Sequence, residues 1–383
     1  MAKENYKIKR LGQVFTPENV AKKMINLIKN GNRILEPSCG DGVFIRLLKN
    51  KNIIGIEKDF ENPNCLKMDF FDYPITEKFD TIIGNPPYVA FKDILKTTKK
   101  KLPMDVFDKR SNLFLFFIYK SFLHLTDNGE IIFITPRDFF SLTSAINLNN
   151  LLYDNGTITD VIEFGDERIF GYKYSPNVVI WRYEKNNFNR KMNYNGEVKY
   201  FYNIEGHYLF LKNKNYTVKL KDIAYVKVGG ASGADNIFTH ESGNVDVVCS
   251  YTKRTGKTKK MIFNIINDHL VKNKNKLMKR KIRKFNEENW YKWGRDFYIS
   301  NKPRVYVNAR TRDTKPFFLH DSIYYDGSIL GIFPKKIIDI VKFKDMLNNV
   351  DWEDLGFVCD GRYIFNQRKL ENTLLPRSFE KFI

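Results

Sequence analysis

The sequence predicts an α/β protein with a doubly wound, mostly parallel sheet followed by a second domain. Short apolar segments alternate with amphipathic segments from residue 18 to about residue 182, an order typical of parallel strands joined by helices. Several apolar segments end at a glycine, a proline or an acid, and the carboxyl ends of parallel strands are where such sheets bind ligands. Beyond residue 185 the sequence becomes polar, aromatic and rich in Asn, which predicts a domain boundary near residues 185–215.

The first elements are predicted to form a helix, a strand and a glycine-containing turn. Thr16 and Pro17 suit the N-cap and the first position of a helix over residues 18–29. A strand over residues 33–35 leads into Glu36-Pro37-Ser38-Cys39-Gly40-Asp41-Gly42, and a helix over residues 43–50 follows. The glycines allow a ligand to approach the backbone closely. Because an acid precedes them, the turn suits a cationic sulfonium amino acid better than a dinucleotide.

Acidic residues also end the next two strands. A strand over residues 53–56 ends at Glu57, where a carboxylate can accept hydrogen bonds from ribose hydroxyls. Asp69 and Phe70 follow a third strand. The aspartate can accept a hydrogen bond from an exocyclic amine, and the phenylalanine can stack on a purine. Three acids at successive strand ends predict a single nucleoside-type site.

The turn Asn85-Pro86-Pro87-Tyr88 follows the buried strand around residues 81–83. Proline has a fixed φ and no N–H group, so the two prolines stiffen this turn and cannot continue a strand ladder. The turn presents an amide oxygen, backbone carbonyls and an aromatic face, which together can hold a planar molecule with an exocyclic NH2 group. Alone, these four residues could equally form an ordinary turn or a docking segment.

The remaining elements of the sheet are assigned from their apolar patterns. Residues 96–110 are predicted to form a mobile basic loop, and residues 112–125 a helix with a large aromatic and aliphatic face. Strands are expected over residues 129–135, 160–164 and 177–181, with Phe170 in a loop before the last of them. The last two strands lie close in sequence, so we expect an antiparallel hairpin at one edge of the sheet.

The C-terminal part is predicted to be an α+β domain that carries much of the positive charge. The chain has a net charge of +20, which favours a polyanionic partner such as nucleic acid, although a Lys-rich composition alone would give the same value. Between residues 271 and 284 there are eight basic residues and no acid, and Trp and Tyr follow. We expect nucleic-acid contacts from Lys272, Lys279, Arg280, Lys281, Arg283, Lys284, Trp290, Arg310 and Arg312.

Composition argues against several other classes of protein. Cys39, Cys65, Cys249 and Cys359 lie far apart, which argues against a zinc site or a disulfide framework and fits a reducing cytoplasm. No apolar stretch reaches the length of about 18 residues that a membrane span needs, and the N-terminus lacks a signal-peptide core. We therefore expect a cytoplasmic protein with no membrane partner and no metal ion.

Taken together, the motifs resemble the gamma arrangement of amino-methylating DNA methyltransferases, the TaqI-type enzymes that modify the N6 of adenine. The resemblance covers residues 12 to about 182, in motif order. It rests on Gly12-Gln13-Val14-Phe15-Thr16-Pro17, Leu35-Glu36-Pro37-Ser38-Cys39-Gly40-Asp41-Gly42, Ile56-Glu57, Asp69-Phe70 and Asn85-Pro86-Pro87-Tyr88. It implies a seven-stranded Rossmann-like methyltransferase sheet in residues 1–200 and a target-recognition domain in residues 201–383.

The resemblance also implies a role for each motif residue. S-adenosylmethionine would be bound by Phe15, Thr16, Glu36, Pro37, Ser38, Cys39, Gly40, Gly42, Glu57, Lys58, Asp69, Phe70, Asn85 and Pro87. Asn85, Pro86, Pro87 and Tyr88 would form the catalytic turn, with the target amine held by Asn85 and the carbonyl of Pro86. Tyr88 and Phe170 would stack on the extruded base, although Tyr172 or Tyr174 could replace Phe170.

The expected partner is double-stranded DNA, bound by a monomer, and an accompanying restriction endonuclease is left open. Alternatives remain. Enzymes that methylate a glutamine of release factors share the Asn-Pro-Pro-Tyr turn, but they usually carry their extra domain before the cofactor motif. RNA adenine methylation, N4-cytosine methylation and a catalytically idle DNA-binding protein are the others.

Overall fold

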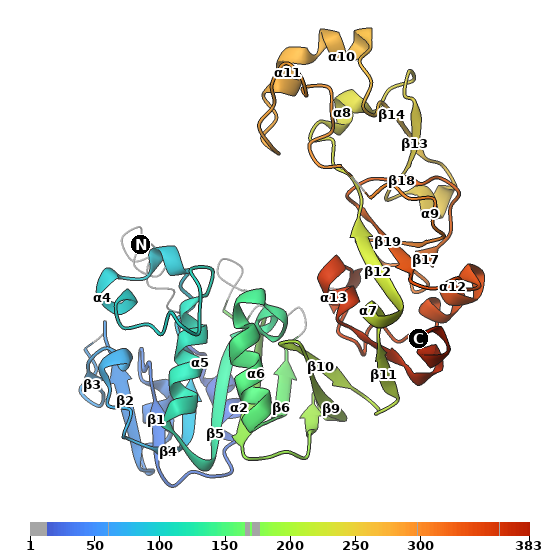
Figure 1. The fold of residues 1–383 in the computed structure, drawn as a ribbon. Helices are drawn as coiled ribbons and strands as arrows, with labels where there is room; N and C mark the ends of the chain where they lie inside the picture. Colours follow the sequence, from blue (N-terminus) through green and yellow to red (C-terminus); the bar gives the residue numbers. More distant parts are fainter. Residues whose placement is uncertain (1–13, 60, 165–168, 171–176, 297, 360) are drawn as a thin grey trace. The chain divides into compact units, whose positions relative to one another are not determined.

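The computed structural model describes residues 14–59, 61–164, 169–170, 177–296, 298–359 and 361–383. The chain forms two compact units, residues 1–213 and residues 214–383. Figure 1 shows the first unit in blue to green and the second in yellow to red. The predicted boundary between residues 200 and 201 falls within a strand of the first unit, β9 (Glu197–Ile204).

The first unit is built on a ten-stranded sheet with the order β10-β9-β8-β6-β7-β5-β4-β1-β2-β3. Its other strands are β1 (Ile34–Glu36), β2 (Ile53–Glu57), β3 (Leu66–Lys67), β4 (Phe79–Gly84), β5 (Leu125–Pro136), β6 (Gly156–Glu163), β7 (Val178–Lys185), β8 (Lys191–Tyr194) and β10 (His207–Leu211). Its helices are α2 (Glu18–Ile25), α3 (Val43–Leu47), α4 (Lys96–Lys99), α5 (Leu113–His124) and α6 (Ile146–Asn155), with short 3-10 turns over Phe70–Asp72, Phe91–Asp93, Arg137–Ser141 and Thr143–Ala145.

The sheet is mixed, and it is larger than predicted. β3, β2, β1, β4 and β5 are parallel, whereas β7 lies between β5 and β6 and is antiparallel to both. The predicted antiparallel pair of late strands is therefore present, but it is not at an edge, because β8 pairs with the far side of β6. β8, β9 and β10 bring the sheet to ten strands rather than the expected seven.

Helices cover both faces of the sheet, because successive residues of a strand point to opposite faces. In β5, Ile131 and Phe133 pack into a core cluster that also contains residues of α5 and α6. Ile132 and Ile134 pack on the opposite face with residues of α2 and α3. Each buried strand is thus apolar on both sides, as expected for a sheet with helices on both faces.

One buried ion pair joins four strands of the first unit. Glu130 on β5 is fully buried, and its Oε2 accepts a hydrogen bond from Nε of Arg182 on β7 at 2.6 Å. Its Oε1 accepts from the hydroxyl of Thr81 on β4 at 2.8 Å and from the amides of Lys29 and Asn30 at 3.0 Å. The Arg182 guanidinium also approaches Asp160 on β6 at 3.7 Å, so one charged cluster fixes the relative positions of these strands.

The second unit contains several small sheets rather than one large one. Its strands are β11 (Tyr216–Lys219), β12 (Ala224–Val228), β13 (Val245–Val248), β14 (Lys259–Met261), β15 (Val305–Asn308), β16 (Arg310–Thr311), β17 (Phe317–Phe318), β18 (Tyr324–Tyr325), β19 (Ile329–Pro334), β20 (Val358–Cys359), β21 (Arg362–Ile364) and β22 (Leu374–Pro376). Its helices are α7 (Leu220–Ile223), α8 (Asp235–Phe238), α9 (Thr252–Thr255), α10 (Asp268–Lys272), α11 (Lys274–Met278), α12 (Ile340–Asn348) and α13 (Gln367–Glu371), and a 3-10 turn spans Arg377–Phe382. The largest of these sheets has the order β12-β19-β15-β17.

The buried ion pair gives the first testable prediction. Glu130→Gln leaves Arg182 buried without its nearest carboxylate, so the free energy of unfolding should fall by roughly 3 kcal/mol. Urea unfolding of the full chain measures the change. The matched control is Glu184→Gln, because Glu184 pairs with the same guanidinium at 3.2 Å but is 30% exposed, and it should cost less than about 1 kcal/mol. Equal losses in the two variants would show that burial of the ion pair is not the cause.

Candidate functional site

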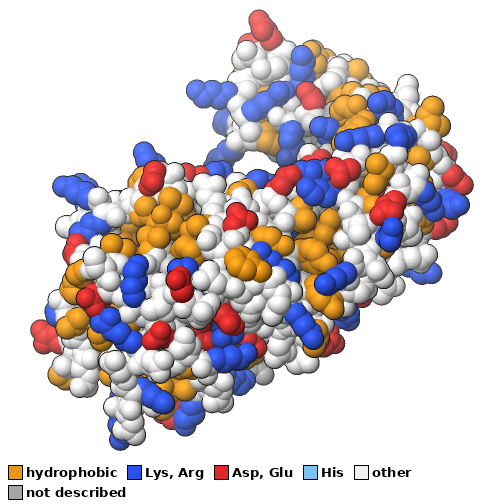
Figure 2. All heavy atoms as spheres, turned by 60° about the horizontal axis from the view of Figure 1, so that its bottom comes forward, with side chains coloured by type: hydrophobic (Ala, Val, Ile, Leu, Met, Phe, Trp, Pro, Cys, Tyr) orange, Lys and Arg blue, Asp and Glu red, His pale blue; other side chains and the backbone are white. Residues whose placement is uncertain are grey.

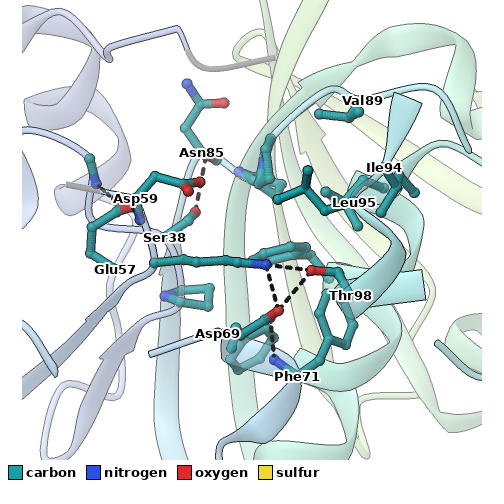
Figure 3. A pocket seen from close by; sticks show the side chains of 18 of the residues that line it. Ser38, Glu57, Asp59, Asp69, Phe71, Asn85, Val89, Ile94, Leu95 and Thr98 are labelled. Atoms are coloured by element: carbon teal, nitrogen blue, oxygen red, sulfur yellow. Dashed lines mark hydrogen bonds and ion pairs between the residues drawn. The ribbon is translucent and has the colours of Figure 1, made fainter. Parts of the chain in front are cut away.

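The predicted strand-end residues gather at one edge of the large sheet. The cavity at this edge receives residues from the loops after β1, β2, β3 and β4 and from the segment that precedes α5 (Figure 3). Its lining is Val14, Phe15, Pro37, Ser38, Gly40, Glu57, Lys58, Asp59, Met68, Asp69, Phe70, Phe71, Asn85, Pro86, Pro87, Val89, Asp93, Ile94, Leu95, Thr98, Leu113 and Phe117. The parallel direction of β1, β2 and β4 places their carboxyl ends together, as the sequence predicted.

The amide of Asn85 is held in one orientation by the segment before α2. Its Nδ2 donates to the carbonyl of Val14 at 2.9 Å and to the hydroxyl of Thr16 at 3.2 Å. The backbone carbonyl of Asn85 accepts a hydrogen bond from Ser38 Oγ at 3.2 Å, which ties this turn to the loop after β1. Both amide hydrogens therefore have protein partners, and no described residue donates to Oδ1. The side-chain oxygen remains available as an acceptor.

The loop after β1 contains two glycines with left-handed backbone conformations. Gly40 has φ +54° and Gly42 has φ +77°, a region in which other residues are strained. At Gly42 a Cβ would lie 2.5 Å from Nδ2 of Asn62, so a larger residue would also clash. The Gly40 amide donates to Oε2 of Glu57 at 2.7 Å, and the Asp59 amide donates to Oε1 at 2.7 Å. These hydrogen bonds hold the Glu57 carboxylate in one orientation and connect it to the glycine-containing turn.

Glu36 is a buried carboxylate with an unused acceptor. The side chain is 1% exposed, and its Oε2 has no hydrogen-bond partner among the described residues. Burial raises the pKa of this carboxyl well above its usual range, and the nearby carboxylates of Asp41 and Glu57 raise it further. A buried polar atom without a partner costs free energy, so a ligand that brings a positive charge or a donor to Glu36 would relieve that cost.

Asp69 is the centre of a polar cluster that closes one side of the cavity. Its Oδ2 accepts from Lys58 Nζ at 2.9 Å and from Thr98 Oγ1 at 2.8 Å, and its Oδ1 accepts from the Phe71 amide at 3.1 Å. Burial raises the pKa of Asp69, but these hydrogen bonds outweigh it and hold the pKa below its usual value. Asp69 is therefore ionised at neutral pH.

The sequence did not indicate the residues that α4 and its neighbours add to the site. Thr98 on α4, together with Ile94 and Leu95, lines the cavity, although residues 96–110 were predicted to be a mobile loop. The signal was present but weak: the apolar pair Ile94-Leu95 precedes the lysines, and Thr97-Thr98 lies between them. Leu113 and Phe117 of α5 complete this wall, and Phe70 packs on Phe117 with ring centroids 5.2 Å apart.

Four of the predicted cofactor residues lie behind the cavity wall or beside it. Thr16, Glu36, Cys39 and Gly42 are not in the lining, and all four are buried. Cys39 packs below the loop, with its Sγ 3.8 Å from the carbonyl of Glu36. Burial raises the pKa of its thiol, so Cys39 is a packing residue rather than a nucleophile.

The two predicted base-stacking residues pack at the margin of the same hydrophobic cluster. Tyr88 and Phe170 both lie against the cluster that contains Ile134 and Val178. The Tyr88 hydroxyl donates to the carbonyl of Ile134 at 2.9 Å, and its ring meets Phe114 edge-on at 6.0 Å. The alternatives Tyr172 and Tyr174 lie outside the described residues.

The predicted nucleic-acid contacts of the second unit fall into two groups. Lys272, Lys279, Lys281, Lys284, Arg310 and Arg312 are exposed. Several of them, with Arg283, surround a shallow hollow lined by Met278, Lys279, Arg280, Lys281, Arg283, Lys284 and Phe285. Arg283 is half-buried, and its Nη2 donates to the carbonyl of Trp293 at 2.7 Å.

Arg280 and Trp290 differ from this expectation because both are buried. Arg280 donates to the carbonyls of Leu277, Ser232, Trp290 and Lys292 at 2.5 to 3.0 Å, and its guanidinium lies 3.7 Å from the centre of the Phe285 ring. Trp290 is 5% exposed. These side chains stabilise the loop that carries the exposed lysines, and neither offers a surface to a phosphate.

The described residues show neither a membrane-spanning helix nor a metal site. No helix there has the length and the apolar character that crossing a membrane requires. The same residues contain no group of three or more His, Cys, Asp or Glu side chains arranged to hold a metal ion.

The Asp69 cluster predicts how stability depends on pH. Because the pKa of Asp69 is lowered in the folded protein, its contribution is present above the usual pKa of about 4 and is lost as pH falls through the lowered value. Asp69→Asn should lower the free energy of unfolding by roughly 2 kcal/mol at neutral pH, and the difference from wild type should shrink in acid. Urea unfolding over a pH series measures this. Asp72→Asn, which changes an exposed carboxylate paired with Lys101, is the control and should have little effect.

Comparison with known proteins finds methyltransferases that are similar to the first unit. Residues 4–170 match the model of the Eco57I restriction-modification methylase family. The type II methyltransferase M.HincII of Haemophilus influenzae is 38% identical over 188 residues, which cover 46% of this chain and 37% of that protein. M.TthHB8I of Thermus thermophilus is 30% identical over 198 residues, which cover 45% of each chain. The matched segments thus span less than half the length of these relatives.

A solved structure is similar over most of the chain. The type IIL restriction-modification enzyme MmeI in complex with DNA covers 93% of this chain and 64% of its own, with a TM-score of 0.56 and 11% identity. At this identity the likeness concerns the fold alone. The resemblance to DNA methyltransferases that the sequence motifs indicated is confirmed by these matches. Over residues 4–170, this chain is similar to the Eco57I restriction-modification methylase family.

Proposed function

We propose that this protein transfers a methyl group from S-adenosylmethionine to the N6 amine of an adenine that is flipped out of duplex DNA. The observation that carries the proposal is the orientation of Asn85. Val14 and Thr16 accept both hydrogens of its amide, so Oδ1 is the atom that faces an incoming amine. An acceptor fixed in this way favours a donor such as an NH2 group over a carbonyl, which can only accept.

The chemistry of an adenine amine calls for acceptors rather than a nucleophile on the protein. The nitrogen lone pair is conjugated with the ring, which makes the amine a poor nucleophile. Hydrogen bonds to Asn85 Oδ1 and the Pro86 carbonyl would draw the nitrogen towards tetrahedral geometry and localise the lone pair. Such bonds strengthen as the transition state forms, and so they accelerate the reaction. The buried Cys39 takes no part.

The residues around the cavity fit S-adenosylmethionine, which supplies the methyl group when bound. Glu36 Oε2 is a buried acceptor without a protein partner, and it would accept from the ammonium group of the cofactor. Glu57 would accept from the ribose hydroxyls. Asp69 would accept from the adenine amine, with Phe70 beside the ring. Each of these side chains already has the orientation that its own protein contacts impose.

The target base must leave the duplex to reach Asn85. Flipping costs roughly a few kcal/mol, and aromatic stacking offsets part of this. Tyr88 and Phe170 would provide the stacking surfaces. In the second unit, the exposed residues Lys272, Lys279, Lys281, Lys284, Arg310 and Arg312 would contact the DNA backbone and base edges, which makes residues 214–383 the target-recognition unit.

We further propose that the protein is the modification component of a restriction-modification system and works as a monomer. Supporting this, the matching relatives are named type II methyltransferases, and RM.Eco57I of Escherichia coli is named as both a restriction enzyme and a methyltransferase. The present chain would then protect the sites that a partner endonuclease cleaves.

Replacement of Asn85 tests the reaction. The protein is incubated with genomic DNA of mixed sequence and S-adenosylmethionine carrying a deuterated methyl group, and the digested nucleosides are measured by mass spectrometry. Wild type should give labelled N6-methyladenine. Asn85→Ala should reduce the rate by about 10²–10³-fold, because it removes one preorganised hydrogen-bond partner of the transition state. Tyr119→Phe, a change on the half-buried side of α5, should leave the rate unchanged.

Other products would contradict the proposal in distinct ways. Labelled N4-methylcytosine would contradict the proposed target base, adenine, but not the proposed cofactor site or the methyl transfer. No labelled base in DNA, with label in RNA or in a protein glutamine instead, would make the substrate class wrong. DNA binding without any methyl transfer would indicate a catalytically idle protein.

Glu36 predicts proton release when the cofactor binds. Its raised pKa means that the neutral carboxyl is stabilised in the free protein, up to a pH well above its usual value. A cationic ligand next to Glu36 favours the carboxylate, so binding should release up to one proton per site below the raised pKa and none above it. Calorimetry in two buffers of different ionisation enthalpy measures this. Glu36→Gln should bind more weakly and release no proton, and equal proton release in both proteins would exclude Glu36 as the source.

A further inference from the structure

The largest sheet of the second unit carries a cluster of aromatic and basic side chains outside the basic run. Tyr225 on β12 is paired in register with Phe333 on β19, and their rings are stacked with centroids 5.1 Å apart. Tyr298 meets the same Phe333 ring edge-on at 5.3 Å. Phe333 is fully buried, whereas Tyr298 is 38% exposed. The two tyrosines therefore stand on a rigid aromatic base and present their hydroxyls at the surface.

The two hydroxyls meet, and lysines lie beside them. The oxygens of Tyr225 and Tyr298 are 3.3 Å apart. Lys227 Nζ lies 5.6 Å from the centre of the Tyr298 ring, and Lys302 Nζ lies 5.9 Å from that of Tyr225. No ion pair joins either lysine to a carboxylate among the described residues. We call Tyr225, Lys227, Tyr298 and Lys302 the tyrosine platform.

The hydroxyl pair leaves one donor free. A phenol can donate one hydrogen bond, so a pair linked by one bond has a second O–H group to offer. The hydrogen bond from Tyr225 lowers the pKa of Tyr298, as do the charges of Lys302 and Lys227 and a hydrogen bond from Ser300. A more acidic phenol is a stronger donor. The platform thus combines one strong O–H donor with two ammonium groups, which suits an anion with several oxygens.

We propose that the tyrosine platform binds a phosphate of the DNA backbone, as a contact separate from the basic run of residues 271–284. This inference rests on the proposed function, since it takes duplex DNA as the partner. Glu371, a carboxylate next to β12, accepts a hydrogen bond from the Val226 amide. Within the described part of the chain, no carboxylate forms an ion pair with Lys227 or Lys302, so the positive charge of the platform is not neutralised there.

Figure 2 explains why net charge alone could not identify such a contact. Lys and Arg side chains are spread over the visible face and are mixed with Asp and Glu. A phosphate contact is distinguished from this background by neighbouring donors fixed in one place. Here the fixed donors are the two phenols, whose rings are held by Phe333 and by each other, with centroids 5.8 Å apart.

The test measures binding of the full chain to a short fluorescein-labelled DNA duplex of mixed sequence by anisotropy, over about 50 to 200 mM salt. Loss of one phosphate contact flattens the plot of log affinity against log salt by about 0.9. The double variant Lys227→Gln/Lys302→Gln should flatten it by about that amount, and each single variant by less, because the two lysines share one phosphate. The matched control is Lys342→Gln, which removes the same charge from an exposed position on α12 of the same unit and should leave the slope unchanged.

The tyrosines give a second measurement that keeps the charge constant. Tyr298→Phe retains the ring and removes the more exposed hydroxyl of the pair, so affinity should fall about tenfold. Either hydroxyl can donate within the pair, so Tyr225→Phe should also weaken binding, but less, by about threefold, because Tyr225 is half-buried. Unchanged melting temperatures would show that both variants fold.

Each outcome separates this inference from the proposed function. If wild type binds the duplex and the platform variants match Lys342→Gln, the platform is not a phosphate contact, and the proposed function stands. If wild type does not bind duplex DNA, the proposed function fails and this inference fails with it. If the variants weaken binding to single-stranded RNA but not to the duplex, the platform serves another nucleic acid and the inference is overturned.

Discussion

The first unit depends on the carboxylate of Glu130, because this one group anchors two elements that meet again at the site. Glu130 holds the amides of Lys29 and Asn30, just after α2, and the hydroxyl of Thr81 on β4. Before α2 lies Thr16, and after β4 lies Asn85. Thr16 and Asn85 are joined by a hydrogen bond. The helix and the strand are therefore linked twice, once at this bond and once at Glu130. A buried charge with this many partners tolerates little rearrangement, so the Asn85 amide is positioned by the scaffold rather than by its own turn.

The strand ends could be predicted from the sequence because glycine, proline and acidic residues interrupt apolar segments there. Glu36, Glu57, Asp69 and Asn85 all lie at one edge of the sheet, since parallel strands present the same end to the same side. The strands beyond residue 185 were harder to predict. β8 and β9 contain Asn, Lys and Tyr, β10 is only five residues long, and the Asn195-Gly196 turn, with both residues at positive φ, is the clear hairpin signal. The edge position of the antiparallel pair was wrong for the same reason, because these strands were not expected to extend the sheet.

The segment before α5 was expected to be a loop, but Lys96–Lys99 form α4 and Thr98 is buried. Lysine and threonine dominate residues 96–101, and such composition usually indicates a solvated segment. The decisive contacts are long-range: Thr98 and Lys101 both reach Asp69, which is 29 to 32 residues earlier in the chain. A pattern that reports only local periodicity cannot show that two distant segments share one carboxylate. The same contacts mean that the wall of the cavity and the strand-end acid move together.

The basic residues of this chain include two distinct groups, buried arginines and exposed lysines. A count of basic residues does not separate the two groups. Arg182, Arg280 and Arg304 are all buried, and their guanidinium groups are used inside the protein, by carboxylates in the first case and by backbone carbonyls in the other two. Arginine suits this role because its planar guanidinium offers five donors in a fixed geometry. By contrast, Lys272, Lys279, Lys281 and Lys284 are exposed. The charge at the surface is therefore smaller than the number of basic residues suggests, because part of it lies inside the protein.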